Sequence, residues 1–268
     1  MDALRQIDEW GAEHAAAVAA APGGELARHG DAEHVFRWAS VTKLVTALAA
    51  LVAAEEGTLD LDEPAGPPGA TVCHLLAHAS GLPFDGSRPI ARPGERRIYS
   101  NTGFEALAEH LAGRAEMPFA EYLEGAVLEP LGMHAELRGS AAAHLWGTLE
   151  DLVRLAGELL EPTLIAPETL AEATSVAFPG RMGVLPDFGR FDPNDWGLGF
   201  ELRDGKDPHW TGSRNSSRTF GHFGGSGTFL WVDPERNLAL GCLTDRGFGE
   251  WAKQAWPRLS DAVLAEAL

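Results

Sequence analysis

Lysine is scarce in this chain of 268 residues: only three of its 21 basic residues are lysine, and 39 acidic residues outnumber them. The net charge of −18 would repel an anionic partner such as nucleic acid or an acidic membrane surface, unless a local basic patch compensated. The one basic cluster, ARPGERR at residues 91–97, is explained most simply as a solvated loop. We therefore expect neither nucleic-acid binding nor membrane association.

Cysteine is also rare, and its two occurrences, Cys73 and Cys242, lie far apart in the sequence. A disulfide framework is not expected, and buried free thiols are the simpler interpretation. The longest apolar run, residues 44–54, is well short of the roughly 18 residues that span a bilayer. The first ten residues lack the basic start and apolar run of a secretory signal, which favours a cytoplasmic protein.

The apolar content of 45% is enough for a substantial core, and no internal repeat divides the chain, so we expect a single domain. A strand pair is predicted over residues 14–31, with its turn at the Pro-Gly-Gly of residues 22–24. Residues 40–56 are apolar on nearly every face and predict a buried helix. Further predictions are helices over 71–80, 101–113, 118–133 and 148–160, strands within 196–202, 219–234 and 237–245, and a closing helix over 249–268.

Ser40 stands three positions before Lys43, at the start of that buried helix. Residues three apart share a helix face, so the hydroxyl and the amine can touch. Serine is a poor nucleophile until a base removes its proton, and lysine is such a base only where burial and a helix N-terminus lower its pKa. Arginine could not serve, because it does not deprotonate. The pair is a candidate nucleophile and base; a helix cap followed by a surface lysine is the alternative.

Tyr99, one of only two tyrosines, stands two residues before Asn101. On a tight loop their side chains would point the same way, offering a phenol that relays protons and an amide that orients both a lysine and a substrate. The alternative is a loop aromatic followed by a helix capped by Asn101 or Thr102. Thr148 and Asp151 show the spacing of a capping box at the start of another helix.

Residues 221–228, GHFGGSGT, place several glycines within a predicted strand. Such glycines cost stability and usually mark the close approach of a ligand or another backbone. An edge strand here would present His222 and a backbone N–H to a cleft, and this N–H would join that of Ser40 in a two-donor oxyanion hole. A glycine-rich turn with a surface histidine is the alternative.

Three motifs in this order, Ser40-Val41-Thr42-Lys43, Tyr99-Ser100-Asn101 and His222-Phe223-Gly224, resemble those of the penicillin-recognising serine hydrolases. The Tyr-x-Asn form is similar to the branch that holds class C β-lactamases, D-Ala-D-Ala carboxypeptidases and esterases. Supporting segments, among them HLLAHASGL and FAEYLEGAVLEPLGM, extend the resemblance over most of the chain.

The resemblance implies a role for each matching residue. Ser40 would be the acylated nucleophile, Lys43 its proton acceptor and Tyr99 the proton relay. Asn101, His222 and Gly224 would bind and orient the substrate, and the backbone N–H groups of Ser40 and Gly225 would form the oxyanion hole. No metal and no organic cofactor are implied. The implied fold is α+β: an antiparallel sheet flanked by helices, built from about residues 1–38 and 195–268, and an all-helical lobe over about 39–194, with the cleft at their junction.

One departure redirects the substrate prediction. His222 stands where many members carry a lysine, whose fixed positive charge would pair with the carboxylate of a penicillin or a peptidoglycan peptide. The region before Ser40 is also short for the class. We therefore expect a hydrolase that cleaves a small ester or amide through an acyl-enzyme. A true β-lactamase, a D-Ala-D-Ala carboxypeptidase and a non-catalytic ligand-binding or sensor protein remain alternatives, and the sequence does not indicate an oligomeric state.

Two other classes of enzyme are disfavoured. His74 and His78 stand four apart on a predicted helix beside Cys73, a spacing that zinc can use. The glutamate of an H-E-x-x-H zinc site is missing, however, and the segment resembles a structural part of the same hydrolases. An α/β-hydrolase is disfavoured because no G-x-S-x-G motif occurs.

Overall fold

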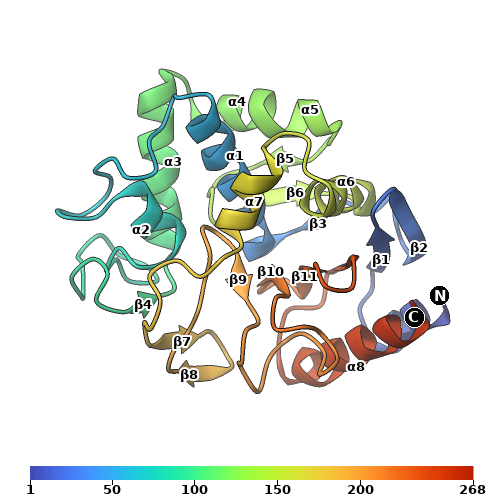
Figure 1. Ribbon diagram of the computed structural model, residues 1–268. Helices are drawn as coiled ribbons and strands as arrows, with labels where there is room; N and C mark the ends of the chain where they lie inside the picture. Colours follow the sequence, from blue (N-terminus) through green and yellow to red (C-terminus); the bar gives the residue numbers. More distant parts are fainter. Residues whose placement is uncertain (268) are drawn as a thin grey trace.

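The computed structural model describes residues 1–267, and its largest element is a six-stranded sheet in the order β2-β1-β12-β11-β10-β9. Both ends of the chain contribute to it, because β1 pairs antiparallel with β12 (Figure 1). The predicted strand pair at residues 14–31 is confirmed. The strands are β1 (Ala15–Ala21), β2 (Gly24–Gly30), β9 (Glu201–Leu202), β10 (Phe220–Gly224), β11 (Thr228–Asp233) and β12 (Leu238–Thr244).

Helices cover both faces of this sheet and build the region above it in Figure 1. They are α1 (Thr42–Glu55), α2 (Val72–Leu76), α3 (Asn101–Ala115), α4 (Phe119–Leu123), α5 (Glu129–Leu131), α6 (Leu149–Leu160), α7 (Pro167–Ala173) and α8 (Glu250–Glu266). Two 3₁₀ helices, η1 (Asp2–Glu9) and η2 (Ala39–Val41), and a π-helical segment, η3 (Glu124–Leu128), complete the helical elements. The closing helix predicted over 249–268 corresponds to α8, and residue 268 lies outside the described residues.

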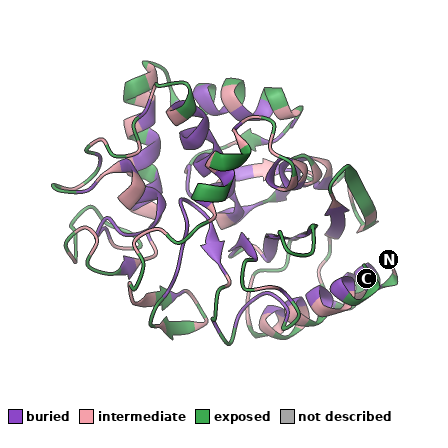
Figure 2. Ribbon diagram, viewed as in Figure 1, coloured by how far each residue is buried: buried purple, intermediate pink, exposed green. Residues whose placement is uncertain are grey.

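The strands at the centre of the large sheet are buried on both faces (Figure 2). On β1, Ala16 and Val18 belong to the core that also holds α1 and α6, whereas Ala17 and Ala19 belong to the core beneath α8. Side chains alternate between the two faces of a strand, so a strand covered on both faces is apolar throughout. This explains the run of alanine and valine in β1.

Helix α1 lies inside the larger core, and twelve of its 14 residues, Thr42 to Ala53, are buried, as predicted. Helix α3 begins one residue after its cap, Ser100, whose hydroxyl accepts the Gly103 N–H at 2.8 Å. The cap predicted at Asn101 or Thr102 is therefore wrong by one or two residues. Three consecutive residues here are all good capping types, so the sequence alone does not choose between them.

The capping box of α6 is confirmed. The Thr148 N–H donates to Oδ2 of Asp151 at 2.8 Å, and the Asp151 N–H donates to the Thr148 hydroxyl at 3.4 Å. Asp thus performs the reciprocal bond that Glu or Gln usually makes. None of the helices formed by residues 1–267 combines the length and the apolar character that a membrane span requires.

Two small sheets accompany the helices between residues 36 and 191. One has the order β3-β6-β5 and the other β4-β7-β8. The region predicted as all-helical thus holds short strands as well. The prediction missed them because strands of two or three residues are too short to show alternation. The fold is the expected mixed one, an antiparallel sheet flanked by helices beside a mainly helical region. The short strands are β3 (Phe36–Arg37), β4 (Arg97–Ile98), β5 (Glu136–Leu137), β6 (Leu145–Gly147), β7 (Gly183–Leu185) and β8 (Gly189–Phe191).

Candidate active site

Ser40 lies in the η2 turn that leads into α1. Ala39, directly before it, has a φ of +45°, in the left-handed region that residues with a side chain rarely adopt. The turn is anchored from two sides through Trp38, whose N–H donates to the Leu145 carbonyl at 2.9 Å and whose carbonyl accepts the Thr228 hydroxyl at 2.8 Å. Contacts from β6 and β11 therefore hold the strained turn in place.

The side chain of Lys43 is fully buried beneath this turn. Its Nζ lies 3.4 Å from Oγ of Ser40 and donates to Oδ1 of Asn101 and to the Ala142 carbonyl, each at 2.8 Å. The same nitrogen lies 4.8 Å from the centre of the Tyr99 ring. The structure thus brings together the first two predicted motifs, which are 56 residues apart.

Burial lowers the pKa of the Lys43 ammonium from 10.5 to about 7, although the charges of Glu105 and Asp85 act in the opposite direction. A large share of the molecules therefore carries a neutral amine at neutral pH. The lone pair of that amine is able to take a proton from the hydroxyl of Ser40.

The Ala142 carbonyl is held by the segment that precedes β6. The hydroxyl of Thr46 donates to the Ala141 carbonyl at 2.7 Å, and the Leu145 N–H donates to the Thr42 hydroxyl at 3.0 Å. These bonds fix the segment against α1 and place the carbonyl of Ala142 beside the amine. Sequence reasoning missed Ala142, because a backbone carbonyl leaves no residue-type signal.

Tyr99 and His222 face each other, with 3.4 Å between the phenol oxygen and Nε2. Nδ1 of His222 donates to the Phe223 carbonyl at 2.7 Å, since a carbonyl only accepts. Burial, with the charge of Lys43, lowers the pKa of His222 to about 3. The ring is therefore neutral, and its Nε2 is left as an acceptor for the Tyr99 hydroxyl.

Tyr99 stays protonated, because burial raises its pKa above the usual 10, even though a hydrogen bond with Ser40 acts the other way. The neighbouring Ser100 fixes the loop: its hydroxyl donates to the Pro83 carbonyl at 2.6 Å, and its N–H donates to Nδ1 of His78 at 3.1 Å. The buried His78 ring packs 4.6 Å from that of Tyr99. His78 thus supports the tyrosine from behind.

The zinc site weighed from the sequence does not assemble. His74 contacts the Thr71 hydroxyl through Nδ1 at 2.9 Å and caps α2, while Nδ1 of His78 is used by Ser100. In residues 1–267, the group with ligand atoms close enough for a metal is instead His14, Asp31 and His34, on the partly exposed surface beside β1 and β2.

The glycine-rich segment packs against the turn that carries Ser40. A Cβ on Gly224 would lie 2.5 Å from the Trp38 carbonyl oxygen and from the Thr228 hydroxyl, so a side chain there has no room. A Cβ on Gly225 would meet nothing within 4 Å, because that residue is exposed. The close packing at Gly224 brings the turn after β10 up to the turn that carries Ser40. The space at Gly225 stays open, and this residue shares a cavity wall with Ser40.

Two backbone N–H groups at this contact are available to bind a ligand oxygen. Those of Ser40 and Gly225 donate to no acceptor in residues 1–267, whereas the Gly225 carbonyl accepts the Phe248 N–H at 3.0 Å. Strand β10 was predicted as an edge strand, but it has β9 beside it. Because β9 pairs only with Phe220 and Gly221, the edge of β10 is open from His222 onward.

Four of the predicted site residues, Ser40, Tyr99, His222 and Gly225, line one cavity of about 140 Å³. Lys43 lies behind Ser40 in the interior rather than on the cavity wall. The wall also contains residues that sequence reasoning missed, including Trp196 and Glu201.

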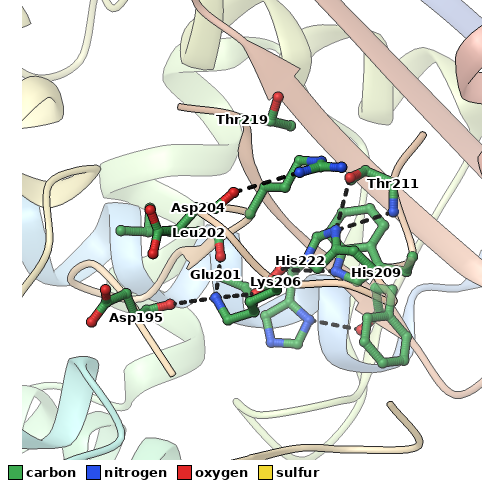
Figure 3. Close-up of polar contacts among 12 residues, drawn as sticks. Asp195, Glu201, Leu202, Asp204, Lys206, His209, Thr211, Thr219 and His222 are labelled. Atoms are coloured by element: carbon green, nitrogen blue, oxygen red, sulfur yellow. Dashed lines mark hydrogen bonds and ion pairs between the residues drawn. The ribbon is translucent and has the colours of Figure 1, made fainter. Parts of the chain in front are cut away.

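Glu201 is the most unexpected of them, because its carboxylate is only 1% exposed. One oxygen lies 2.8 Å from Nζ of Lys206, and the other accepts Nε2–H of His209 at 2.9 Å and Nε1–H of Trp210 at 2.8 Å. Figure 3 shows Glu201, Lys206 and His209 grouped beside His222. The scarcity of lysine was the available signal, since Lys206 is one of three.

The charge state of this cluster follows from its contacts. Burial by itself would raise the pKa of Glu201, but Lys206 and His209 outweigh it and hold the value at about 2. Lys206 also donates to the carbonyls of Asp195, at 2.7 Å, and Leu202. Glu201 is therefore a permanent, internally neutralised carboxylate in the wall of the cavity.

Comparisons with known proteins agree with this geometry. The sequence profile described as Beta-lactamase matches residues 2–265. The crystal structure of a β-lactamase from Mycobacterium bovis has 54% sequence identity, with 99% of each chain covered and a TM-score of 0.98. EstCE1, a hydrolase with promiscuous acyltransferase activity, shares the fold with a TM-score of 0.77 at 19% identity, covering 98% of this chain and 96% of that one.

Among curated proteins, the D-alanyl-D-alanine-carboxypeptidase/endopeptidase AmpH of Escherichia coli is 30% identical across 38% of this chain and 36% of its own length. The match therefore spans about a third of that relative. The family profile, in contrast, extends over nearly the whole chain, including all three motifs that meet around the cavity. The resemblance seen in the sequence is confirmed, and the chain belongs to the Beta-lactamase family.

Proposed function

We propose that this protein is a serine hydrolase that cleaves a small ester or amide through an acyl-enzyme on Ser40. The observation that carries the proposal is the buried amine of Lys43, whose pKa is about 7 and whose Nζ lies 3.4 Å from Oγ of Ser40. A surface lysine with an ordinary pKa would not act as a base at neutral pH. Membership in a family of serine hydrolases supports the same reaction.

In the first step, the neutral amine of Lys43 accepts the proton of Ser40 as Oγ forms a bond to the substrate carbonyl carbon. The carbonyl oxygen becomes an oxyanion and binds the N–H groups of Ser40 and Gly225. The C–O or C–N bond then breaks, and the leaving group takes a proton from Lys43 through the Tyr99 hydroxyl. Water attacks the acyl-enzyme by the reverse proton path and releases the acid.

Asn101 and His222 complete this arrangement. The Asn101 side-chain oxygen accepts a hydrogen bond from the amine, so it holds Nζ in place. His222 accepts the Tyr99 hydroxyl and thereby orients the phenol. As a neutral ring, His222 supplies no positive charge for a substrate carboxylate, which favours an ester or amide without a carboxylate beside the scissile bond.

β-Lactam hydrolysis is the second candidate, because a protein described as a β-lactamase is 54% identical over almost the entire chain. A D-Ala-D-Ala carboxypeptidase is a third candidate, which the name of AmpH suggests. Both kinds of substrate carry a carboxylate close to the bond that is cleaved. The charge at His222 therefore separates these candidates from an esterase.

The test is to incubate the protein with p-nitrophenyl acetate, a chromogenic cephalosporin and a fluorescent penicillin, alongside Ser40→Ala. Ser87→Ala is a matched control, because Ser87 is an exposed loop serine. We expect ester hydrolysis by the wild type and by Ser87→Ala, none by Ser40→Ala, and an acyl adduct on Ser40 by mass spectrometry.

Each other outcome has a distinct meaning. Undiminished turnover by Ser40→Ala would overturn the mechanism. A cephalosporin rate well above the ester rate would identify a β-lactamase. Penicillin that labels Ser40 and is never released, without ester turnover, would indicate a ligand-binding or sensor protein.

A further inference from the structure

A second and larger cavity adjoins the one at Ser40. Its volume is about 510 Å³, and residues of β4 and of the β7–β8 hairpin, which pair in one sheet, line it. The two cavities share Phe84, Tyr99 and Pro186 in their walls, so the larger one continues outward from the reaction site. The proposed reaction needs only the smaller cavity, which leaves the outer one without a role.

The wall of the outer cavity is partly apolar and exposed. Phe84, Ile90 and Val184 are 50%, 56% and 56% exposed, and they are three of the seven large hydrophobic side chains exposed in residues 1–267. Single exposed apolar residues are ordinary, but a group that shares one concave wall is typical of a binding site. The apolar part of a ligand fits this wall.

Arginine supplies the charge of the outer cavity, and no acidic residue lines it. Nη2 of Arg96 donates to the Ile90 carbonyl at 3.1 Å, and Nη2 of Arg190 lies 3.0 Å from Sδ of Met182. Ile90 and Met182 both line the cavity, so each guanidinium is held at its wall with further N–H groups to offer.

The two guanidinium groups lack a counter-charge. Neither Arg96 nor Arg190 forms an ion pair with a carboxylate of residues 1–267, whereas the nearby Arg92 pairs with Glu95 at 3.5 Å. The third arginine of the wall, Arg97, is buried and is occupied by backbone carbonyls. Arg96, from the basic cluster at residues 91–97 that the sequence alone explains as a solvated loop, thus faces a cavity in a protein of net charge −18.

The inner cavity has the opposite character. Its wall holds the carboxylates of Asp187 and Glu201, the latter paired with Lys206, and its histidine, His222, is neutral. An anionic group therefore finds no counter-charge in the wall beside Ser40, but finds one at the arginines of the outer cavity. A substrate that spans both cavities would be uncharged at the scissile bond and negative at its far end.

We propose that the outer cavity binds the part of the substrate remote from the scissile bond, and that this part is an apolar chain ending in a carboxylate held by Arg96 and Arg190. A planar guanidinium matches the two oxygens of a carboxylate. The substrate class becomes the half-ester of a dicarboxylic acid, or an ester of a hydroxy acid. This inference deepens the proposed hydrolase function and rests on it only for the identity of the reacting group.

The experiment measures binding, so that it does not depend on turnover. Calorimetry on Ser40→Ala compares monomethyl adipate with methyl hexanoate, and 6-acetoxyhexanoate with hexyl acetate. Within each pair only the terminal carboxylate differs, and the two pairs place it on the acyl or on the alcohol side. We expect the carboxylate to tighten binding by about ten-fold in at least one pair, as for a charge-assisted hydrogen bond near the surface.

The arginines are tested in the same background with Arg96→Gln/Arg190→Gln. This change should remove the ten-fold advantage and leave the neutral esters unaffected. Arg92→Gln is the matched control, because Arg92 is an exposed arginine on the same loop that does not line the cavity. Rising salt should weaken the anionic ligands alone. Thermal unfolding of each variant establishes that it is folded.

Two results would overturn the proposal: a carboxylate that brings no gain in either pair, or an equal loss for neutral and anionic ligands in the double variant. Turnover of the same esters by the wild type separates this inference from the proposed function. If the carboxylate ligands bind through the arginines but no ester is hydrolysed, the outer site stands and the hydrolase proposal fails. If neutral esters are hydrolysed without any gain from a carboxylate, the hydrolase stands and the outer site fails.

Discussion

Lys43 donates a 2.8 Å hydrogen bond to the side-chain oxygen of Asn101, and this bond joins the first turn of α1 to the first residue of α3. Together with the Ala142 carbonyl, it gives the amine two fixed acceptors besides Ser40. A buried ammonium would use both acceptors, and the neutral amine retains them while its lone pair is free. In the proposed mechanism, the reactivity of Ser40 therefore depends on the protonation of this one nitrogen.

The first prediction concerns pH. Only the neutral form of Lys43 accepts a proton, and the pKa of its ammonium is about 7. We expect kcat/KM for p-nitrophenyl acetate to fall about ten-fold per pH unit below 7 and to level off above it. Rates measured between pH 5 and 9 test this, and a profile that stays flat through pH 7 would contradict the assigned base.

The second prediction concerns Asn101. Asn101→Asp would put a negative charge 2.8 Å from the amine, which raises the pKa of Lys43. The rise in kcat/KM should then move to higher pH by one unit or more. Asn101→Ala removes the acceptor without adding charge and should lower kcat by about ten-fold or more through loss of position. An identical pH profile in wild type and Asn101→Asp would show that the two side chains do not interact in solution.

The third prediction concerns the charge at His222. His222→Lys places a cation where the neutral ring now stands, so substrates with a carboxylate near the scissile bond should gain. We expect the ratio of cephalosporin to ester turnover to rise by about ten-fold or more. The added charge would also lower the pKa of Lys43 and shift the acid limb to lower pH. Ratios measured at pH 8 decide the matter, and an unchanged ratio would exclude charge at this position as the determinant of substrate class.

The fourth prediction compares neighbouring glycines. Gly224→Ala would force a methyl group to within 2.5 Å of the Trp38 carbonyl oxygen, whereas Gly225→Ala would meet open space. We expect Gly224→Ala to reduce the free energy of unfolding by about 1–3 kcal/mol, as overpacking does, and Gly225→Ala to change it little. Urea titration of both variants gives the comparison. Equal stabilities of the two variants would mean that β10 does not pack closely against the turn that carries Ser40.

The fifth prediction concerns Glu201. Glu201→Gln would leave the ammonium of Lys206 buried without its carboxylate, so the free energy of unfolding should fall by about 3–5 kcal/mol. In the wild type the pKa of Glu201 is about 2, lower than in the unfolded chain. Its contribution is therefore present above about pH 4.5 and is lost as the pH falls toward 2.

Glu201→Gln should lack this acid-dependent loss. Unfolding free energies of both proteins between pH 2 and 7 test the prediction. Parallel curves for the two proteins would show that Glu201 is not ionised through that range.

The sequence predicted the parts of the site that depend on local spacing. Ser40 and Lys43 are three apart on one helix face, and Tyr99 and Asn101 are two apart on one loop, so their proximity within each motif follows from local geometry. The buried helix followed from apolar patterning, and the two strands at the start of the chain followed from the Pro-Gly-Gly turn between them.

Other parts depend on contacts between distant segments and left no such signal. The Ala142 carbonyl reaches Lys43 because a segment 99 residues away packs on α1. Glu201 lies in the strand predicted within 196–202, but its place in the cavity wall depends on a buried cluster with Lys206 that the pattern does not show. The cavity at Arg96 and Arg190 forms only because β7 and β8 fold against β4, and strands this short show no periodicity.

Because β1 pairs with β12, the large sheet cannot be completed until both of these distant strands have been synthesised. Ser40 and Lys43 leave the ribosome early, but the turn that carries Gly225 is made nearly 200 residues later, and the sheet that supports it closes only with the final strands. A nascent chain that stops before residue 225 therefore holds Ser40 and Lys43 without the Gly225 N–H. In the proposed mechanism, the Ser40 hydroxyl therefore gains its oxyanion hole only after β10, β11 and β12 have been made.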